Sequence, residues 1–478
     1  MSFASPIFLW YFVPAVLLAH WILPSTWRNG IVALVSLLFY TWGAGPFAFL
    51  LLAVIAVNYA AGLAIDSNKL ADNVPARRTL LISTVTLNLA VLMVWKYAGF
   101  ATQQANAIAH ALGVGSVAII ELALPIGISF YTFHHISYVV DVYRRSRRAQ
   151  KSIIQFTTYI AMFPQLIAGP IVRYHEISEQ LCDTRRNRFN DFAAGFPRFA
   201  LGLCKKVIIA DSLAPIADAA FAHPAGELNT ATAWIGAIAF TLQIYFDFSG
   251  YSDMAIGLGV MLGFRLPDNF NHPYSAYSIT DFWRRWHMSL SRWFRDYVYI
   301  PLGGNRTGKI NNYRNLLIIF ILCGFWHGAN WTFLIWGLYH GTLLIVERVL
   351  GFTEPPKSQL NRVLRRGLTF SLVVVGWVPF RSATLDDAAE MISAMFTWRP
   401  GLPDEFVIFA INNQRALIFA LAIAVVFFPP ARTLGDVIDS GKGAWPAMAR
   451  TAVTFIGAPY AALLVAAGTF SPFLYYQF

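Results

Sequence analysis

Two histidines, His327 and His340, lie in a segment that is otherwise almost wholly apolar. The segment runs from Leu316 to Glu347 and has no charged residue before Glu347. An ionisable group at membrane depth costs about 2–3 kcal/mol or more, so such residues mark a functional site by default. An imidazole, with an unperturbed pKa of about 6.5, is suited to act as a general base near neutral pH. These two histidines are the first candidates for chemistry.

A third histidine, His287, lies in the stretch 281–306, which is rich in aromatic and basic residues. Its apolar residues recur at spacings of three and four, which predicts an amphipathic helix in the cytoplasmic membrane interface. The apolar face would consist of Trp283, Trp286, Leu290, Trp293, Phe294 and Tyr297. The basic residues off that face are Arg284, Arg285, Arg292 and Arg295. On this pattern alone, His287 could equally be a solvated residue of an interfacial anchor.

The composition places these residues in a membrane protein. The chain has 478 residues, of which 57% are hydrophobic and 13% charged, whereas soluble domains carry about 25% charged residues. The net charge of +11 comes from lysines and arginines in short loops between apolar runs, as the positive-inside rule requires, and therefore does not indicate a nucleic-acid partner. The three cysteines have neither metal-binding nor redox spacing, so no metal site is expected.

The apolar segments predict an all-α, polytopic membrane protein with about ten spanning helices in a single domain, residues 1–478. Basic loops such as 144–151 are expected in the cytoplasm, and the loops 101–116 and 221–230, which lack Lys and Arg, outside. The expected spans are 5–23, 31–43, 48–65, 79–98, 118–140, 193–220, 232–262, 367–380, 405–428 and 448–470.

Two further apolar segments, 152–172 and 316–347, lie between basic loops and are expected to enter and leave the membrane on the cytoplasmic side. The run from Leu316 to Trp326 would be about 16 Å long as a helix, about half the thickness of the hydrocarbon core. The sequence GAN (328–330) can break the helix there. His327 is therefore predicted near mid-membrane at the end of a re-entrant segment, where irregular backbone must be buried in protein or line a cavity.

Several long motifs in order give the chain a specific resemblance to the membrane-bound O-acyltransferase (MBOAT) family, over most of its length. The motifs are LPIGISFYTFHHISYVVDVYR, FPQLIAGPIVRYHE, FDFSGYSDMAIGLGVMLGFRLPDNFNHPY, FWRRWHMSLSRWFRDYVYIPLGG, FWHGANWTFLIWGLYHG and the terminal FLYYQF. The family's two signature histidines correspond to His287 and His327. The resemblance implies that His327 is catalytic and that His287 is its partner across a central tunnel.

The chemistry of acyl transfer fits these residues. A base must take the hydroxyl proton of the acceptor while the tetrahedral centre forms, and a half-buried imidazole stays neutral for that task. Trp326 and Trp331 are expected to wall the tunnel, and Asn330 is a candidate donor to the developing oxyanion. His340 is assigned a structural or tunnel-lining role. Cys323 lies one helical turn before His327, but an acyl-enzyme on it is disfavoured, because free cysteine commonly serves as an apolar filler and the family uses no active-site cysteine.

Other polar residues keep two interpretations open. Asp247 lies in an apolar run. It either makes the tunnel polar or has a structural role, in which it holds unwound backbone or pairs with an arginine. Arg284, Arg285, Arg292 and Arg295 are candidates to bind the phosphates of a coenzyme A donor, or they only determine topology beside anionic lipid. His134 and His135 are interpreted as architectural.

The sequence thus predicts a multi-pass O-acetyltransferase of a bacterial inner membrane, which needs no cofactor beyond its donor substrate, acetyl-CoA. The resemblance implies a periplasmic acceptor protein or the exported polysaccharide itself as acceptor, with alginate favoured. Peptidoglycan, cellulose and teichoic acid are alternative acceptors within the same chemistry. A transporter or channel is the alternative of another class, but the halves show no repeat; a scaffold would leave the histidines unexplained.

Overall fold

The computed structural model describes residues 3–183, 188–223, 228–306, 308–428, 431–440, 443–468 and 473–474. All regular elements in these ranges are helices, which confirms the all-α prediction. Residues 224–227 of the predicted outer loop and residues 475–478 of the terminal motif lie outside the described residues. The chain separates into two compact units, of which one comprises chiefly 7–195 and 258–267, and the other chiefly 196–257 and 268–478.

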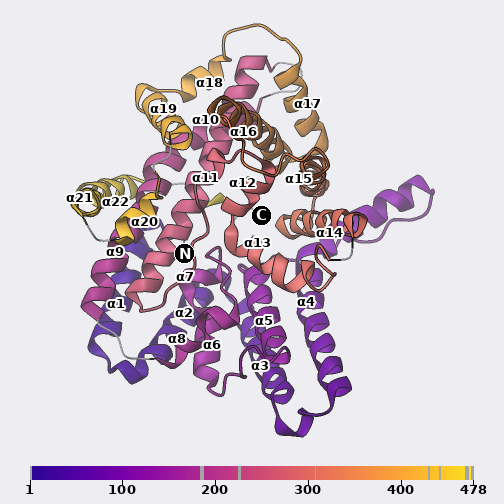
Figure 1. Cartoon of the computed structure of the whole chain (residues 1–478), viewed down its shortest axis with the longest axis vertical. Coiled ribbons are helices and arrows are strands. Elements are labelled where there is room, and N and C mark those ends of the chain that lie inside the picture. Colours follow the sequence, from indigo (N-terminus) through magenta and orange to yellow (C-terminus); the bar gives the residue numbers. More distant parts are fainter. Residues whose placement is uncertain are drawn as a thin grey trace. The chain divides into compact units, whose positions relative to one another are not determined.

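In the first unit, buried polar side chains hold the helices together. The amides of Asn58 and Asn88 exchange two hydrogen bonds of 3.0 and 2.8 Å between α3 and α4. Such pairing satisfies polar groups that could not stay unpaired in lipid. The unit's main helices (Figure 1) are α1 (Val13–Ile22), α2 (Arg28–Ala44), α3 (Phe47–Ile65), α4 (Val74–Ala111), α5 (Ile128–Tyr143), α6 (Ile153–Ala161), α7 (Phe163–Leu166) and α8 (Tyr174–Cys182).

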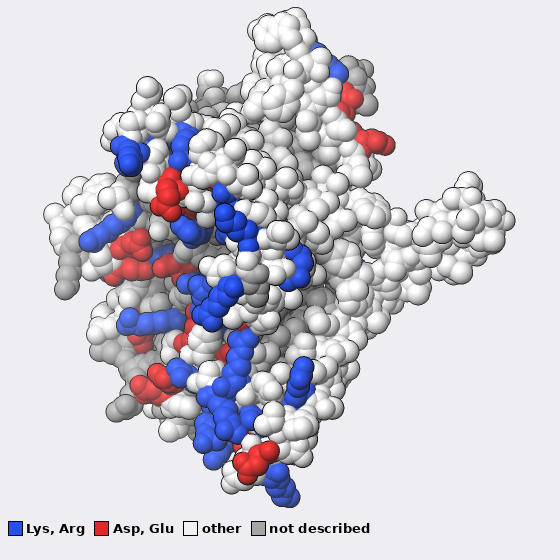
Figure 2. All heavy atoms as spheres, turned by 45° about the vertical axis from the view of Figure 1, so that its right-hand side comes forward, with Lys and Arg blue, Asp and Glu red and all other residues white. Residues whose placement is uncertain are grey.

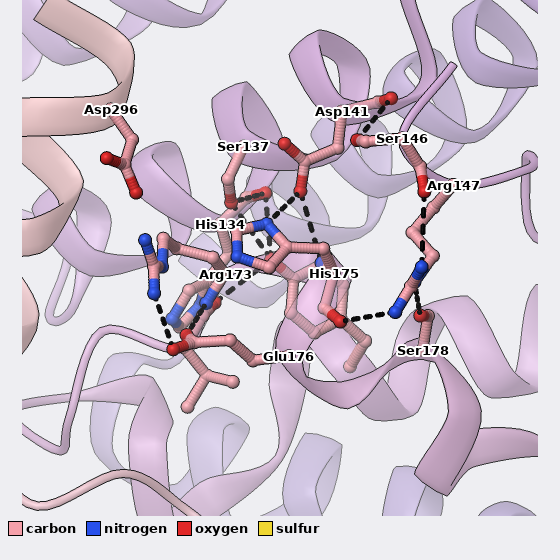
Figure 3. A network of polar contacts seen from close by, with 12 residues as sticks. His134, Ser137, Asp141, Ser146, Arg147, Arg173, His175, Glu176, Ser178 and Asp296 are labelled. Atoms are coloured by element: carbon pink, nitrogen blue, oxygen red, sulfur yellow. Dashed lines mark hydrogen bonds and ion pairs between the residues drawn. The ribbon is translucent and has the colours of Figure 1, made fainter. Parts of the chain in front are cut away.

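The basic loop 144–151 is tied to α8 in the first unit (Figure 3). Asp141 accepts hydrogen bonds from the backbone N–H and from Nδ1 of His175, at 3.1 and 2.9 Å. Arg147 donates to Ser178 Oγ at 3.0 Å and pairs with Glu179 at 3.0 Å. The loop that the sequence analysis placed in the cytoplasm is therefore a fixed part of this unit.

The second unit contains the predicted site residues. Its long helix α11 (Thr230–Met261) is mostly buried. Its other elements are the end of α9 (Arg188–Cys204), η4 (Lys205–Ala210), α10 (Asp211–Phe221), α12 (Ile279–Arg285), α13 (Met288–Phe294), η6 (Arg295–Tyr299), α14 (Lys309–His327), α15 (Trp331–Val349), α16 (Gln359–Arg381), α17 (Leu385–Phe396), α18 (Glu405–Ala410), α19 (Asn413–Phe427), α20 (Leu434–Ser440), α21 (Ala444–Ala452), η7 (Val453–Gly457) and α22 (Ala458–Ala466).

The predicted count of about ten spanning helices is not confirmed. Within the described residues, 5 helices are long and apolar enough to cross a membrane. They are Phe47–Ile65, Val74–Ala111, Thr230–Met261, Gln359–Arg381 and Ala444–Ala466. Phe8–Ile22 and Asn413–Phe427 are apolar but shorter. The expected span 405–428 is divided into α18 and α19, so composition alone overestimated the number of long helices.

The predicted span 118–140 is wrong over its first half, because the helix α5 begins only at Ile128. Residues 114–124 are not helical, and they run along α4. Asn106 Nδ2 donates to the carbonyl of Val117, and Asn106 Oδ1 accepts from its N–H, both at 2.8 Å. Gly127, with φ of 75°, then starts the helix. Side-chain hydrogen bonds here replace those that a helix would have made.

The helices α14 and α15 form a tightly packed hairpin within the second unit (Figure 1). A Cβ at Gly324 would overlap the carbonyl oxygen of Phe333, and one at Gly337 would overlap that of Phe320. Small residues let helix backbones approach in this way. The break predicted at 328–330 is confirmed, since α14 ends at His327 and α15 begins at Trp331. The helix α14 starts at Lys309, before the apolar run, so the depth of His327 stays a prediction.

The single amphipathic helix predicted for 281–306 is wrong, because the segment bends at His287. The helix α12 ends at Arg285, and His287 has a φ of 43° as the N-cap of α13. Five of the six residues of the predicted apolar face are nevertheless buried within the protein: Trp283, Trp286, Leu290, Trp293 and Phe294 are each at most 8% exposed, whereas Tyr297 is half-buried. The spacing of apolar residues therefore reflects packing of two short helices against the rest of the second unit, not one continuous helix.

Replacing Gly337 by alanine is expected to destabilise the protein. The new methyl group would push α15 from the backbone of α14, and such overpacking typically costs about 1–3 kcal/mol. Gly367→Ala on α16 is the matched control, since a Cβ there meets no atom within 4 Å. Thermal unfolding in detergent would measure both variants. Equal melting temperatures for Gly337→Ala and Gly367→Ala would contradict the tight packing of the hairpin.

Candidate active site

The imidazole of His327 lies in an aromatic enclosure at the end of α14. It is 7% exposed, and its ring centroid lies 4.8 Å from that of Trp326, 5.2 Å from Trp336 and 5.1 Å from Phe380. Gly328 must lack a side chain, because a Cβ there would overlap the ring of Phe333. The C-terminus of the helix thus delivers the imidazole into a small, enclosed and largely apolar space.

His287 is buried at the bend between α12 and α13. It is 1% exposed, its Nδ1 lies 3.1 Å from Asn269 Oδ1, and its ring packs edge-on against Phe248 of α11 at 4.7 Å. A positive φ is uncommon for a residue other than glycine, although histidine, asparagine and aspartate tolerate it better than most. A solvated anchor, one interpretation of the sequence, does not fit this burial.

Trp326 brings the two histidines together. Its ring centroid lies 6.3 Å from His287 and 4.8 Å from His327. The two histidines predicted to act together are distant in sequence, but both rings lie beside the indole of Trp326. Their catalytic roles stay predictions. Sequence reasoning missed Trp336 and Phe380; the first stands in the same motif, whereas nothing in the sequence connects α16 with His327.

Trp331 and Asn330 are placed differently from the expectation. Trp331 is 45% exposed, so it does not enclose His327 as Trp326 and Trp336 do. Asn330 is the N-cap of α15: its Oδ1 accepts from Thr332 N at 3.2 Å, and its Nδ2 donates to the carbonyl of Ala383 at 2.9 Å. The amide thus closes the helix and ties the hairpin tip to the residues after α16. Its role as an oxyanion donor stays a prediction.

His340 is fully buried, at 0% exposed, in a second aromatic cluster. Its ring lies 5.2 Å from Trp283 and 5.2 Å from Trp336, and its nitrogens have no hydrogen-bond partner in the described part of the chain. Trp336 therefore contacts both His340 and His327. This placement fits the structural or lining role expected for His340.

Asp247 is 2% exposed and engaged in structural contacts. Its Oδ1 pairs with Lys206 Nζ at 2.7 Å, and its Oδ2 accepts from Leu474 N at 3.0 Å. Lys206, 1% exposed, also pairs with Asp211 at 2.7 Å. Buried charges are normally paired in this way. Of the two interpretations of Asp247, its contacts favour structural support.

A cavity of about 240 Å³ in the second unit leads from a basic rim toward α14. Arg284 and Arg295 are exposed at its rim, and Cys323 is buried inside. Cys323 lies one helical turn before His327. The other lining residues are Thr280, Trp283, Leu290, Ser291, Phe294, Tyr299, Leu316, Ile319, Phe320, Leu344 and Arg348. We call this cavity the basic pocket.

The four candidate arginines divide into two pairs. Arg284 and Arg295 line the basic pocket, and Arg295 also pairs with Asp296 at 2.7 Å. Arg285 pairs with Asp281 at 2.9 Å, and Arg292 donates to the carbonyl of Asp268 at 3.1 Å; neither is among the residues that line this pocket. The sequence missed Arg348, a third arginine of the pocket, because it follows the apolar segment rather than the aromatic motif.

A second cavity, of about 410 Å³, opens beyond the hairpin tip. Arg381, Ser382 and Ala383 line it and directly follow Phe380, which packs on His327. Its charged lining residues are mostly acidic: Asp218, Asp386, Asp387 and Glu390. We call it the acidic pocket. His327 thus lies near two cavities of opposite charge, and a continuous tunnel between them stays a prediction.

Comparisons with known proteins identify relatives of the chain. The model of the membrane-bound O-acyltransferase family, MBOAT, matches residues 131–365. A probable alginate O-acetylase, AlgI, of Azotobacter vinelandii is 42% identical, with 100% of both chains covered. That of Pseudomonas aeruginosa is 46% identical over 84% of this chain and 76% of its own length. A peptidoglycan O-acetyltransferase of Helicobacter pylori is 36% identical over 83% and 80%.

The Azotobacter vinelandii relative covers the whole length of the chain, and the residues that match the family model include both histidines. The long apolar helices, the α14–α15 hairpin and the enclosed histidine pair are consistent with an acyltransferase embedded in a membrane. The chain is a multi-pass membrane protein that belongs to the membrane-bound O-acyltransferase family.

Proposed function

We propose that this chain takes acetyl groups from cytoplasmic acetyl-CoA and transfers them, across a bacterial inner membrane, for the O-acetylation of alginate. The observation that carries the proposal is the enclosure of His327 and His287 around Trp326, one helical turn beyond the basic pocket. The names of the AlgI relatives support alginate as the polysaccharide. The relative named for peptidoglycan is less similar, at 36% identity.

The basic pocket suits the donor. Coenzyme A carries phosphates at one end and a thioester at the other, joined by a narrow chain. Arg284 and Arg295 at the rim would bind the phosphates by charge and bidentate hydrogen bonds. The narrow, largely apolar interior near Cys323 would direct the thioester toward His327. The cytoplasmic side is assigned to this rim because arginines collect there. Figure 2 shows Lys and Arg side chains on the surface, together with areas that carry no charge.

The acidic pocket suits an acceptor that is not itself acidic. Alginate is a polyuronate, and its carboxylates would be repelled by Asp386 and Asp387. The other two carboxylates of the lining are paired, Asp218 with Arg381 at 2.8 Å and Glu390 with Arg399 at 3.4 Å. A periplasmic protein that receives the acetyl group on a hydroxyl and passes it to the polysaccharide avoids this repulsion. The lining of this pocket therefore supports a partner protein as the immediate acceptor.

The transfer would proceed in one step at His327. The acceptor hydroxyl attacks the thioester carbonyl while an imidazole nitrogen of His327 takes its proton. The tetrahedral centre collapses with cleavage of the carbon–sulfur bond, and the proton goes from His327 to the departing thiolate of coenzyme A. The products are an acetyl ester and free coenzyme A, and no other reactant is required. The apolar walls from Trp326, Trp336 and Phe380 exclude water, which would otherwise hydrolyse the thioester.

His327→Gln is expected to reduce acetyl transfer by at least about 100-fold, the usual contribution of a general base. His287→Asn should also reduce it strongly. Asparagine is chosen because, unlike alanine, it tolerates the positive φ. Transfer of radiolabelled acetyl from acetyl-CoA would be measured on purified protein of unchanged melting temperature.

His272→Asn is the matched control for this pair of variants, since His272 has a φ of 46°, close to the 43° of His287. It should keep near-normal transfer. Retention of more than a few per cent of turnover by His327→Gln would refute the role of His327 as the base.

Arg284→Gln and Arg295→Gln are expected to raise the KM for acetyl-CoA about tenfold, a loss of about 1.4 kcal/mol of binding, with little change in kcat. Arg285→Gln, which removes the same charge from an arginine that does not line the pocket, should change the KM less than about twofold. Steady-state kinetics with varied acetyl-CoA would measure this. Equal KM values for all three variants would remove the basic pocket as the phosphate site.

Cys323→Ser should leave transfer almost unchanged, because the thiol is not expected to carry the acetyl group. Cys323→Phe should instead fill the interior of the basic pocket and block the donor. Mass spectrometry of the protein mixed rapidly with acetyl-CoA provides the second readout. An acetyl group trapped on Cys323 and absent from the Ser variant would overturn the one-step transfer.

A further inference from the structure

Asn269 is almost completely buried, at 1% exposed, and contacts His287 across the bend between α12 and α13. Its Oδ1 lies 3.1 Å from His287 Nδ1, and it accepts from the backbone N–H of Ser289 at 3.1 Å and from Ser289 Oγ at 2.9 Å. Its backbone carbonyl accepts from Met288 N at 2.9 Å. One asparagine thus contacts each of the three residues at the bend.

These contacts determine which atoms carry protons. The oxygen and nitrogen of an amide must be told apart by their partners. The backbone N–H of Ser289 can only donate, so the amide atom that faces it is Oδ1. Because that oxygen can only accept, the nitrogen of His287 at 3.1 Å from it must be the protonated one. In a neutral ring the lone pair is then on Nε2.

We propose that Asn269 is a positioning residue that holds His287 as the neutral Nδ1–H tautomer, with Nε2 as a hydrogen-bond acceptor at the acyl-transfer site. A neutral imidazole in this tautomer cannot donate a hydrogen bond from Nε2 to the thioester oxygen. His287 therefore serves the reaction as an acceptor of hydrogen bonds or protons and not as an oxyanion donor. Its part in the reaction rests on the proposed function, whereas the tautomer rests on the hydrogen bonds alone.

The segment around Asn269 is itself anchored on both sides. The preceding Asp268 pairs with Arg198 at 2.8 Å, and its carbonyl accepts from Arg292 at 3.1 Å. Asn271 N donates to the carbonyl of Arg285 at 2.9 Å. The amide of Asn269 is therefore held against the bend by contacts that do not involve His287.

The choice of an amide rather than a carboxylate supports this role. Asn269 Nδ2 is buried with no hydrogen-bond partner among the described residues, and leaving a buried donor unpaired is unfavourable. An aspartate would accept the same three hydrogen bonds without that penalty. It would also place a negative charge beside His287 and favour the imidazolium. The asparagine holds the ring in one tautomer without drawing a second proton to it.

The test compares two variants of nearly the same size. Asn269→Asp keeps the acceptor oxygens, whereas Asn269→Leu removes them. The full-length protein would be labelled with ¹⁵N in its histidine rings, and the His287 signals assigned by their loss in His287→Asn. We expect the Nδ1–H tautomer in the unmodified protein and Nδ1–H retained in Asn269→Asp. Asn269→Leu should lose the single tautomer and at least about tenfold in kcat, with a smaller change in KM, while Asn269→Asp recovers part of that loss.

Ser289→Ala is the matched control, because it removes a hydrogen bond to Asn269 but none to His287; it should retain the tautomer. An Nε2–H signal in the unmodified protein would overturn the proposal. So would an unchanged tautomer in an Asn269→Leu variant that keeps its melting temperature. A tautomer that shifts in Asn269→Leu while turnover persists in both Asn269→Leu and His287→Asn would uphold the hydrogen-bond assignment and instead refute the part given to His287 in the transfer.

Discussion

The contact of backbone on backbone between α14 and α15 is the constraint on which the rest of the site depends. Gly324 and Gly337 let the two helices approach until side chains at these positions would overlap the carbonyl oxygens of Phe333 and Phe320. Lipid chains provide little hydrophobic drive for helix association, so such close packing is what can hold a hairpin together in a membrane. The first helix of the hairpin, α14, ends at His327. Trp336 of the second helix, α15, contacts both His327 and His340.

Buried charge has a structural role around α11. Arg198 pairs with Asp253 at 2.7 Å, with Asp268 at 2.8 Å and with Asp439 at 2.6 Å. Gly435 leaves room for it, since a Cβ there would overlap the guanidinium. This cluster joins α9, α11 and α20 to the residue that precedes Asn269. Removal of Arg198 would leave carboxylates of the cluster without this counter-charge, so we infer that the cluster is required for folding.

Sequence reasoning found what depends on residue type and failed where distant segments meet. The break at 328–330 and the buried aromatic face of 281–306 followed from glycines and from periodicity. The bend at His287 did not, because the pattern continues through it and only the contacts of Asn269 reveal it. Phe380 reaches His327 from another helix, and Arg284 and Arg285 are neighbours in sequence that face different partners. The helical start of α5 was missed because Asn106 bonds the backbone of Val117 from a separate helix.

The separation of the basic and acidic pockets has a consequence for the order of binding. Since the two cavities have no lining residue in common, donor and acceptor would not exclude each other sterically. Both could occupy the enzyme at once, and transfer would pass through a ternary complex rather than a ping-pong cycle. Under the proposed function, free coenzyme A would compete with acetyl-CoA but not with the acceptor, so the ratio of acetyl-CoA to free coenzyme A would set the rate at which the polysaccharide is acetylated.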